Sequence, residues 1–435
     1  MEKLELAAEK AAEFVWGPAL LVLLLGAGAY FTVGSGFFPL RKIGFVLRLT
    51  VAGLFKKRDK SAFEAMATAL GATVGTGNIV GVAAAIAIGG PGAVFWMWVG
   101  AFLGMMLKFA EASLAVKFRK EGDGALIYIE KAFGTKKVAA LWAALCVLAS
   151  FGGGSMVQTN AAAAVCREAF GLPEIFIGGA VALLTAAVLF KGAKAVTKTS
   201  SLLVPLMAAF YIIGCGELLF ICRENIPEAF ASIFEGAFRP ISAGGGAAGL
   251  FLSGALRTGL AKGTFTHEAG MGSASLAHAE SREENPAVQG CWGIVEVFTD
   301  TILVCTLTAL VILSSGIAEV TENSTSEIFG KYLGKAGICF LAISMFLFAL
   351  AAVIGWAFYG EKALSFIAKS KKAVIIYRVL FCLCAAAGSA MSLPLVWNLS
   401  DVFNGLMVFP NLGALLALSG TVFGFTKGIF GKSKR

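Results

Sequence analysis

Long apolar segments alternate with short polar loops along the whole chain. About 20 consecutive apolar residues are enough to cross a bilayer as a helix. By that measure the pattern predicts eleven membrane-spanning helices. They lie near residues 16–37, 64–88, 92–116, 137–163, 174–190, 200–221, 241–262, 290–315, 336–358, 373–391 and 402–425. The expected fold is therefore an all-α integral membrane protein without a water-soluble domain.

The second predicted span contains the unusual stretch GATVGTGNIVG, residues 71–81. Each glycine costs a helix about 1 kcal/mol relative to alanine, so this helix is expected to break. Unpaired peptide groups are tolerated in a membrane only where they line a cavity. There, free carbonyls can coordinate a cation and free N–H groups can hold a carboxylate. Alternatively, Gly71, Gly75 and Gly77 form a contact face for a neighbouring helix.

A second glycine-rich stretch, residues 241–278, begins five predicted spans after the first. Transporters built from inverted repeats place broken helices at corresponding positions of their two halves. The pattern therefore predicts two broken helices and a five-plus-five repeat preceded by one extra helix. The predicted units are an N-terminal segment (1–60), a first repeat (61–225) and a second repeat (236–427).

Composition supports a membrane protein, because 58% of the residues are apolar and only 14% are charged. Basic residues gather in every second loop and in the C-terminal tail. The positive-inside rule therefore places the N-terminus outside and the C-terminus in the cytoplasm of a cell-membrane protein. It also explains the excess of 36 basic over 27 acidic residues without a nucleic-acid partner. We expect a monomer.

Several chemistries find no support in the sequence. The nine cysteines contain no CxxC pair, and the two histidines have no second metal ligand at a suitable spacing. Neither a nucleophile elbow nor a phosphate-binding loop occurs in a suitable context, so we do not expect an enzyme. A channel or sensor remains an alternative, because broken helices also line channels.

Several segments resemble one known family over residues 35–425. They include GTGNIVGVAAAIAIGGPGAVFWMWVG, HEAGMGSASLAHA, VFTDTILVCTLTALVIL, IGWAFYGEKAL and WNLSDVFNGLMVFPNLGALLALSG. These motifs and their spacing resemble the bacterial and archaeal alanine or glycine:cation symporters. The resemblance implies the amino acid–polyamine–cation architecture and uptake of a small amino acid coupled to a cation. It implies no cofactor other than Na⁺ or H⁺ as the coupling ion.

The resemblance also assigns substrate-binding residues. The substrate carboxylate is expected to bind at the first break. Two polar side chains are expected to contact the substrate beside it, and an aromatic side chain is expected to form a wall of the pocket. These residues are Gly75, Thr76, Gly77, Asn78, Gln158 and Trp356. Two of them have other interpretations. Gln158 could form a hydrogen bond to a neighbouring helix, and Trp356 could be an aromatic residue at the membrane–water interface.

The sequence departs from the family at the expected sodium site. In the family, backbone carbonyl oxygens coordinate sodium from positions that match Gly71, Val74 and about Phe348 here. Two side-chain hydroxyls, from Ser or Thr in relatives, complete the site. Here Ala351 and Ala352 occupy the hydroxyl positions. Losing two of about five oxygens should weaken sodium binding, because the lost hydration is not replaced. Sodium coupling is therefore doubtful, and a proton or no ion is the alternative, with another small zwitterion as the alternative substrate.

Further polar residues remain open at this stage. His267, where relatives carry Asn, titrates near neutral pH, and Lys198 could place a positive charge near the sodium position. Ser155 also replaces a usual Asn. A plainer interpretation makes Lys198 a positive-inside anchor. Four residues, Arg257, Lys262, His267 and Glu268, could be cytoplasmic loop charges. Glu296 and Asp300 lie in or near the eighth span, where carboxylates are functional by default.

Overall fold

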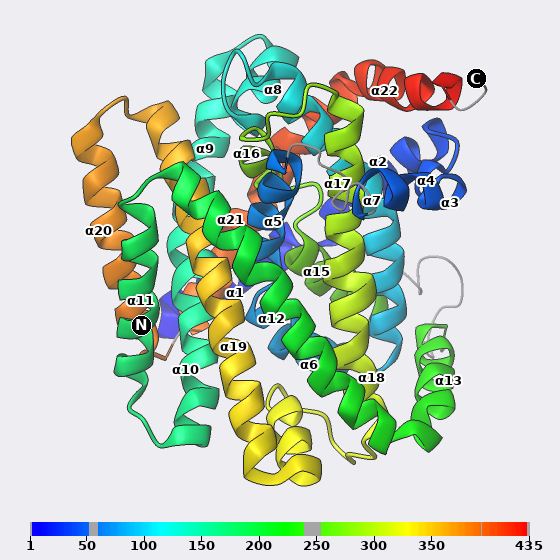
Figure 1. Cartoon of the computed structure of the whole chain (residues 1–435), viewed down its shortest axis with the longest axis vertical. Coiled ribbons are helices and arrows are strands. Elements are labelled where there is room, and N and C mark those ends of the chain that lie inside the picture. The colour runs from blue at the N-terminus through cyan, green and yellow to red at the C-terminus, as the bar shows by residue number, and fades with distance from the viewer. Residues whose placement is uncertain (1, 52–59, 239–253, 393, 433–435) are drawn as a thin grey trace.

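The computed structural model describes residues 2–51, 60–238, 254–392 and 394–432, and within them it contains helices and no strand (Figure 1). The N-terminal helices are α1 (Glu2–Val15), α2 (Pro18–Gly34), α3 (Phe38–Arg41) and α4 (Ile43–Leu49). The following helices are α5 (Ser61–Thr73), η2 (Thr76–Asn78), α6 (Val80–Gly89), α7 (Gly92–Phe118), α8 (Gly124–Phe133), α9 (Lys136–Phe151), η3 (Gly152–Met156), α10 (Val157–Phe170), α11 (Glu174–Leu189), α12 (Ala193–Ile221), η4 (Arg223–Asn225) and α13 (Ile226–Ala237).

The remaining helices begin after residue 253. They are α15 (Gly254–His267), α16 (Ser275–His278), α17 (Pro286–Val297), η5 (Phe298–Cys305), α18 (Thr306–Ser314), α19 (Ser324–Ile367), α20 (Lys371–Gly388), α21 (Pro394–Ala417) and α22 (Ser419–Lys432). Residues 241–253 of the seventh predicted span lie outside the described residues. Local sequence sets several ends: the Asn285 side chain caps α17 ahead of Pro286, and Gly134 ends α8 with φ +66°.

The apolar pattern predicts the membrane helices well. Seven helical stretches of the described chain are long and apolar enough to cross a membrane, and α6 and α11 are shorter apolar helices. The all-α membrane fold is thus confirmed, while the count of eleven spans stays a prediction. One predicted boundary is wrong: residues 402–425 are not one span, because α21 ends at Ala417 and α22 starts at Ser419. Figure 1 shows α22 crossing the long axis at the C-terminal end of the molecule.

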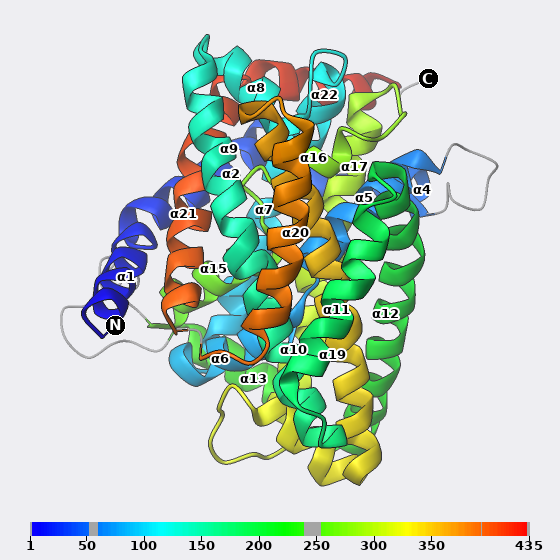
Figure 2. The ribbon, with the colours of Figure 1, turned by 90° about the vertical axis from the view of Figure 1, so that its left-hand side faces the viewer.

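Two interrupted helices occupy the centre of the bundle. The first is α5 and α6, broken between Thr73 and Val80; the second is α15 and α16, broken between His267 and Ser275. Figures 1 and 2 show them surrounded by the long helices. Among these, α12 and α19 pack against α5, while α7 packs against α15. Both breaks fall inside the glycine-rich stretches that predicted them.

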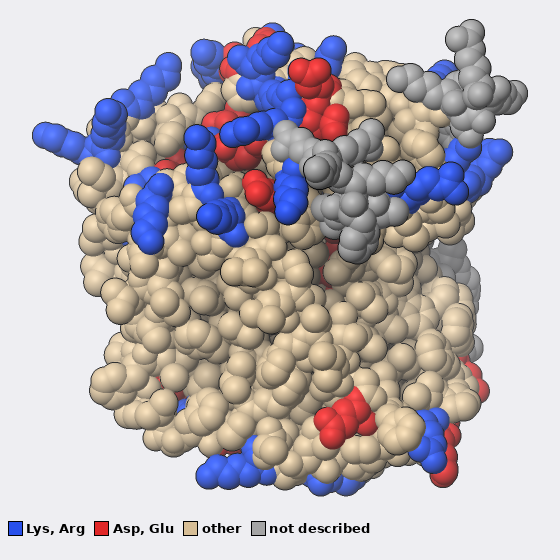
Figure 3. All heavy atoms as spheres, in the orientation of Figure 1, with Lys and Arg blue, Asp and Glu red and all other residues tan. Residues whose placement is uncertain are grey.

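Charge is distributed unevenly over the surface. In Figure 3, Lys and Arg gather mainly at the end where α8, α22 and the C-terminus lie, and a smaller charged group lies at the opposite end. A wide belt almost free of charge separates the two groups on this face. Such a belt matches the apolar interior of a bilayer, where exposed charge is costly.

Close helix contacts depend on small residues, as is usual in membrane bundles. At Gly259 in α15, an added Cβ would lie 2.3 Å from the carbonyl oxygen of Ala93 in α7. At Gly216 on the outer face of α12, an added Cβ would meet nothing within 4 Å. Substituting alanine at each position therefore distinguishes the effect of helix packing from the effect of helix propensity.

We expect Gly259→Ala to lower the thermal unfolding temperature in detergent, because overpacking typically costs about 1–3 kcal/mol. Gly216→Ala is the matched control and should leave that temperature unchanged or raise it, since alanine favours a helix. Equal unfolding temperatures for the two variants would show that α7 and α15 do not pack this closely.

Candidate substrate-binding site

The first break exposes peptide groups at the end of α5. Within the described residues, the carbonyls of residues 71–74 accept no backbone N–H. The chain then makes a short turn in which the N–H of Gly75 donates to Asn78 Oδ1 at 3.0 Å. The N–H of Gly77 finds no partner in the described part of the chain. The break therefore presents free acceptors on one side and a free donor on the other.

Gln158 closes part of this break. Its Oε1 accepts from the N–H of Thr76 at 3.0 Å and from the Thr76 hydroxyl at 2.9 Å. Its Nε2 donates to the carbonyl of Gly153 at 3.0 Å, within the π-helical segment η3. A Cβ on Gly75 would lie 2.6 Å from Gln158 Oε1, so this approach requires glycine. The structure thus brings Gln158 to the break, as the resemblance implied.

Asn78 faces a different neighbour. Its Nδ2 donates to Asp300 Oδ1 at 2.7 Å and to the Asp300 carbonyl at 3.2 Å, and the Asn78 carbonyl accepts from the hydroxyl of Thr308 at 2.9 Å. Asn78 is fully buried among these groups and does not line the cavity described next. In this structure it ties the break to η5 and α18.

A small cavity lies between the two interrupted helices. It has room for about one water-sized molecule. Its lining residues are Ala72, Thr73, Gly77, Gly153, Gln158, Phe265, Thr266, Glu268, Trp356 and Asn404. Three of the predicted substrate residues, Gly77, Gln158 and Trp356, therefore share one cavity. Trp356 is only 4% exposed, so it is not an interfacial aromatic.

The expected sodium position is lined by methyl groups. A Cβ on Gly71 would meet Val204 Cγ2 at 3.0 Å and the Ala351 Cβ at 3.8 Å. A Cβ on Gly75 would meet the Ala352 Cβ at 3.2 Å. Both alanines therefore face the first break where the resemblance placed them. The two positions where the resemblance expects hydroxyl oxygens therefore carry methyl groups beside the first break.

The second break is held by side chains from other helices. Glu111 Oε1 accepts from the N–H groups of Gly270 and Gly272 at 2.9 and 3.0 Å. Asn411 Nδ2 donates to the same oxygen at 2.7 Å and to the Gly270 carbonyl at 2.8 Å. Trp142 Nε1 donates to the Met271 carbonyl at 2.9 Å. The protein itself therefore satisfies much of this backbone.

A buried ionic group lies beside that break. Lys108 Nζ is 3.0 Å from Glu296 Oε1, and His278 Nε2 is 2.9 Å from Glu296 Oε2. Gln289 Nε2 lies 2.7 Å from His278 Nδ1. The side chains of Lys108, Glu296 and His278 are fully buried, which resolves the open depth of Glu296. The group joins α7, α17 and α16.

Comparison with known proteins identifies the family. The chain matches the sodium:alanine symporter family over residues 1–435. The chain belongs to this family. A sodium/alanine symporter, AgcS of Methanococcus maripaludis, is 40% identical over 95% of this chain and 94% of its own. A probable sodium/glutamine symporter, GlnT of Bacillus subtilis, is 36% identical over 94% and 87%.

A solved structure confirms the architecture of this symporter. The crystal structure of MhsT in complex with L-phenylalanine superposes with a TM-score of 0.60 and 15% identity, covering 84% of this chain and 97% of that one. At this identity the likeness concerns the fold alone. Together the comparisons establish a cation-coupled amino-acid transporter of the membrane rather than an enzyme.

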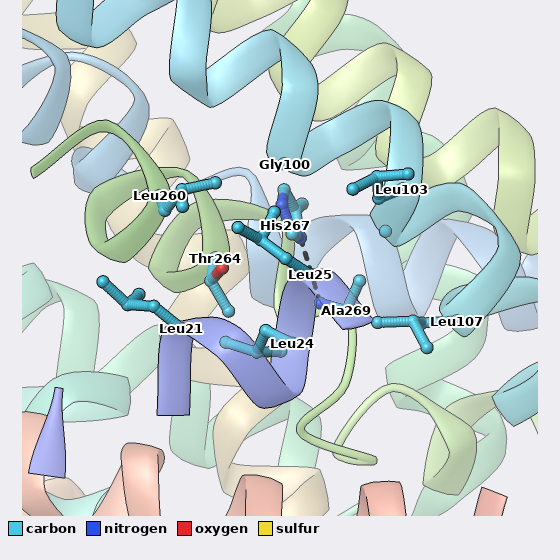
Figure 4. Close-up of a pocket in the computed structure, with 11 residues that line it drawn as sticks. Leu21, Leu24, Leu25, Gly100, Leu103, Leu107, Leu260, Thr264, His267 and Ala269 are labelled. Atoms are coloured by element: carbon cyan, nitrogen blue, oxygen red, sulfur yellow. Dashed lines mark hydrogen bonds between the residues drawn. The ribbon is translucent and has the colours of Figure 1, made fainter. Parts of the chain in front are cut away.

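The symporter's His267 and Glu268 are not cytoplasmic loop charges. Both are 2% exposed, at the end of α15 inside the bundle. His267 Nδ1 accepts from the N–H of Ala269 at 3.0 Å, and Figure 4 shows the ring in a leucine-lined pocket between α2, α7 and α15. His267 does not line the cavity that contains Gln158.

Other open residues of the symporter now have positions. Lys198 is exposed near the start of α12, as a positive-inside anchor would be. Ser155 is buried in η3, and Asp300 is buried against the first break. Arg257 is exposed and Lys262 half-buried in an open hollow beside α1, so both lie apart from the cavity.

Several residues of the site escaped the sequence reasoning. Lys108 and Glu111 stand three residues apart in a mainly apolar helix, which places them on one face. That spacing could have marked the two residues as functional or structural groups, because charged side chains are costly inside a membrane. The positions of Phe265 and Asn404 depend on tertiary packing and had no such signal.

We expect Glu111→Ala to destabilise the symporter strongly, because it strands two backbone donors at about 1–3 kcal/mol each. Glu111→Gln keeps an acceptor oxygen and should be milder. Thermal unfolding in detergent measures both. Equal losses would indicate that the charge of Glu111, rather than its acceptor oxygen, matters for stability.

Proposed function

We propose that this symporter imports a small neutral amino acid, alanine or glycine, by alternating access around the two broken helices. The observation that carries the proposal is the cavity between them, lined by Gly77, Gln158 and Trp356. Peptide groups of a broken helix are suited to a zwitterion, because N–H groups bind the carboxylate.

Gln158 indicates how the carboxylate would bind. Its amide oxygen now accepts from both donors of Thr76. A substrate carboxylate oxygen could take that place, and the free N–H of Gly77 supplies a further donor. Gly75, Thr76 and Gly77 would then hold the carboxylate, with Gln158 turning to it as a donor. Asn78 would support the break without contacting the substrate, through its hydrogen bonds to Gly75 and Asp300.

The dimensions of the cavity favour a small side chain. Trp356 and Phe265 are bulky walls, and the free space is close to that of one water molecule. A substrate must therefore displace side chains, and each added methylene makes this harder. Because one methylene is worth only about 1–3 kcal/mol, selectivity among alanine, glycine and another small zwitterion should be soft.

We further propose that sodium is not the principal coupling ion. Val204, Ala351 and Ala352 present methyl groups where a hard cation needs oxygen. A proton is then the coupling ion, or transport is uncoupled. The gathering of basic residues at the end where α22 lies supports a cytoplasmic C-terminus in the cell membrane. An external N-terminus then rests on the loop pattern of the sequence.

Uptake into proteoliposomes tests this function. We expect labelled alanine and glycine to enter when choline replaces sodium, and an inward pH gradient to increase uptake. Larger neutral amino acids should compete progressively less well, because they do not fit between Trp356 and Phe265. A strict sodium requirement would contradict the assignment of the coupling ion, and no uptake at all would contradict the function.

Restoring hydroxyls tests the sodium position. The double change Ala351→Ser with Ala352→Ser should raise the apparent sodium affinity at least tenfold, about 1.4 kcal/mol. Ala357→Ser, equally buried but on another side of α19, is the control and should not respond to sodium. A double variant indifferent to sodium would show that these alanines do not mark a lost cation site.

A further inference from the structure

Glu268 holds an unusual place in the molecule. It is the first residue after α15, it is 2% exposed, and its φ of +52° is rare for a residue with a side chain. It lines the same cavity as Gln158 and Trp356. A carboxyl group therefore forms part of the wall of the proposed substrate cavity, inside the membrane domain.

Glu268 has fewer partners than the other buried carboxyls. Its Oε2 accepts from the hydroxyl of Ser273, and its Oε1 makes no hydrogen bond with any residue that the structure describes. Glu296, by contrast, is paired with Lys108 and His278.

The remaining two buried carboxyls are also well supplied with donors. Glu111 Oε1 accepts three hydrogen bonds. The two oxygens of Asp300 accept from Asn78 and from the hydroxyl of Thr301. A carboxylate in this interior is costly without donors or a positive partner, and Glu268 has the fewest hydrogen-bond donors of the four buried carboxyls.

The groups around Glu268 do not supply that charge. Its charged or titratable neighbours are Lys108 on α7, Glu296 on α17, Asp300 on η5, Tyr359 on α19, Cys146 on α9 and the adjacent His267. Lys108, the cation among them, already pairs with Glu296 at 3.0 Å. The surplus of carboxyl groups around one lysine leaves Glu268 in need of a cation.

Two further polar atoms point to a missing ligand. Asn404 Oδ1, in the wall of the cavity, is buried without a hydrogen-bond partner in the described structure. The hydroxyl of Tyr359, which has Glu268 and Glu296 among its charged neighbours, is likewise buried and unpaired in the described structure. An acceptor without a donor, in the same cavity as a carboxyl with a single hydrogen-bond donor, indicates a site that takes up positive charge or a proton.

We propose that Glu268 binds the coupling proton. This rests on the proposed function and names the residue through which the cation acts. The proton adds to one oxygen of the Glu268 carboxylate on the outer side and leaves to water on the inner side, so no other bond is made or broken. A neutral carboxyl is far less costly to bury than a carboxylate. Protonation would therefore allow the cavity to close around its substrate.

The position of Glu268 supplies the coupling. It joins α15 to the segment that Glu111 and Asn411 hold, and it faces the substrate cavity from there. A change in the charge of Glu268 thus alters its electrostatic interaction with both the substrate and the broken helix. The methyl-lined sodium position requires such a second cation site if transport is coupled.

The test compares accumulation with exchange in proteoliposomes. Accumulation of labelled alanine against its gradient, driven by an inward pH gradient, needs net proton movement; exchange of alanine for alanine does not. We expect Glu268→Gln to reduce accumulation at least tenfold more than it reduces exchange. Glu268→Asp keeps a titratable group and should retain accumulation. Glu280→Gln is the matched control, because Lys362 keeps Asp123 as a partner, and both activities should be unchanged.

Three results would overturn the proposal. Accumulation by Glu268→Gln equal to that of the unmodified protein would show that the proton binds elsewhere. Equal loss of accumulation and exchange would show that Glu268 binds the substrate. Accumulation driven by a sodium gradient at equal pH, alike in both proteins, would assign the coupling to sodium. If the unmodified protein neither exchanges nor accumulates, the proposed function fails first.

A second measurement does not depend on the variant folding. Alanine added to the unmodified protein in weakly buffered detergent solution should cause proton uptake at some pH of a series, seen with an indicator dye. Absence of proton uptake at every pH would contradict the proposal.

Discussion

Every peptide group inside the bilayer needs a hydrogen-bond partner, and this requirement shapes the centre of the symporter. The two broken helices meet it in different ways. At the second break, Glu111, Asn411 and Trp142 supply partners from neighbouring helices. At the first break, the carbonyls of residues 71–74 and the N–H of Gly77 stay free among the described residues. The scaffold thus supplies partners at one break and leaves peptide groups of the other unpaired among the described residues.

The buried charges follow from the same requirement. Glu111 supplies the acceptor that the backbone N–H groups of Gly270 and Gly272 need. Lys108 then pairs with Glu296 and joins α7 to α17. A buried pair of this kind contributes little net stability, although removing one partner is costly. Its value here lies in fixing the helices around the second break.

The amount that sequence could predict differs between elements. Hydropathy predicted the helices, and the glycine-rich stretches predicted both helix breaks, because both signals depend on local sequence. The resemblance assigned Gln158 and Trp356 to the substrate site, and both line the small cavity between the breaks. It could not show that Asn78 turns toward Asp300, since that depends on how η5 packs. The single span at 402–425 was wrong because hydropathy does not register the turn between α21 and α22. The sequence could not decide whether Glu268 is a loop charge or a group inside the bundle, because its burial depends on tertiary structure.

The proposed loss of the sodium site would illustrate how function diverges within a fixed fold. The carbonyls of Gly71 and Val74 come from the backbone, so the fold presents them whatever the side chains are. The hydroxyls come from side chains, and two alanines remove them without disturbing the helix, since alanine is the best helix former. Coupling then requires another group that senses both the substrate and a cation. A carboxyl at the second break, facing the same cavity, meets both conditions, and a proton needs only one oxygen where sodium needs several.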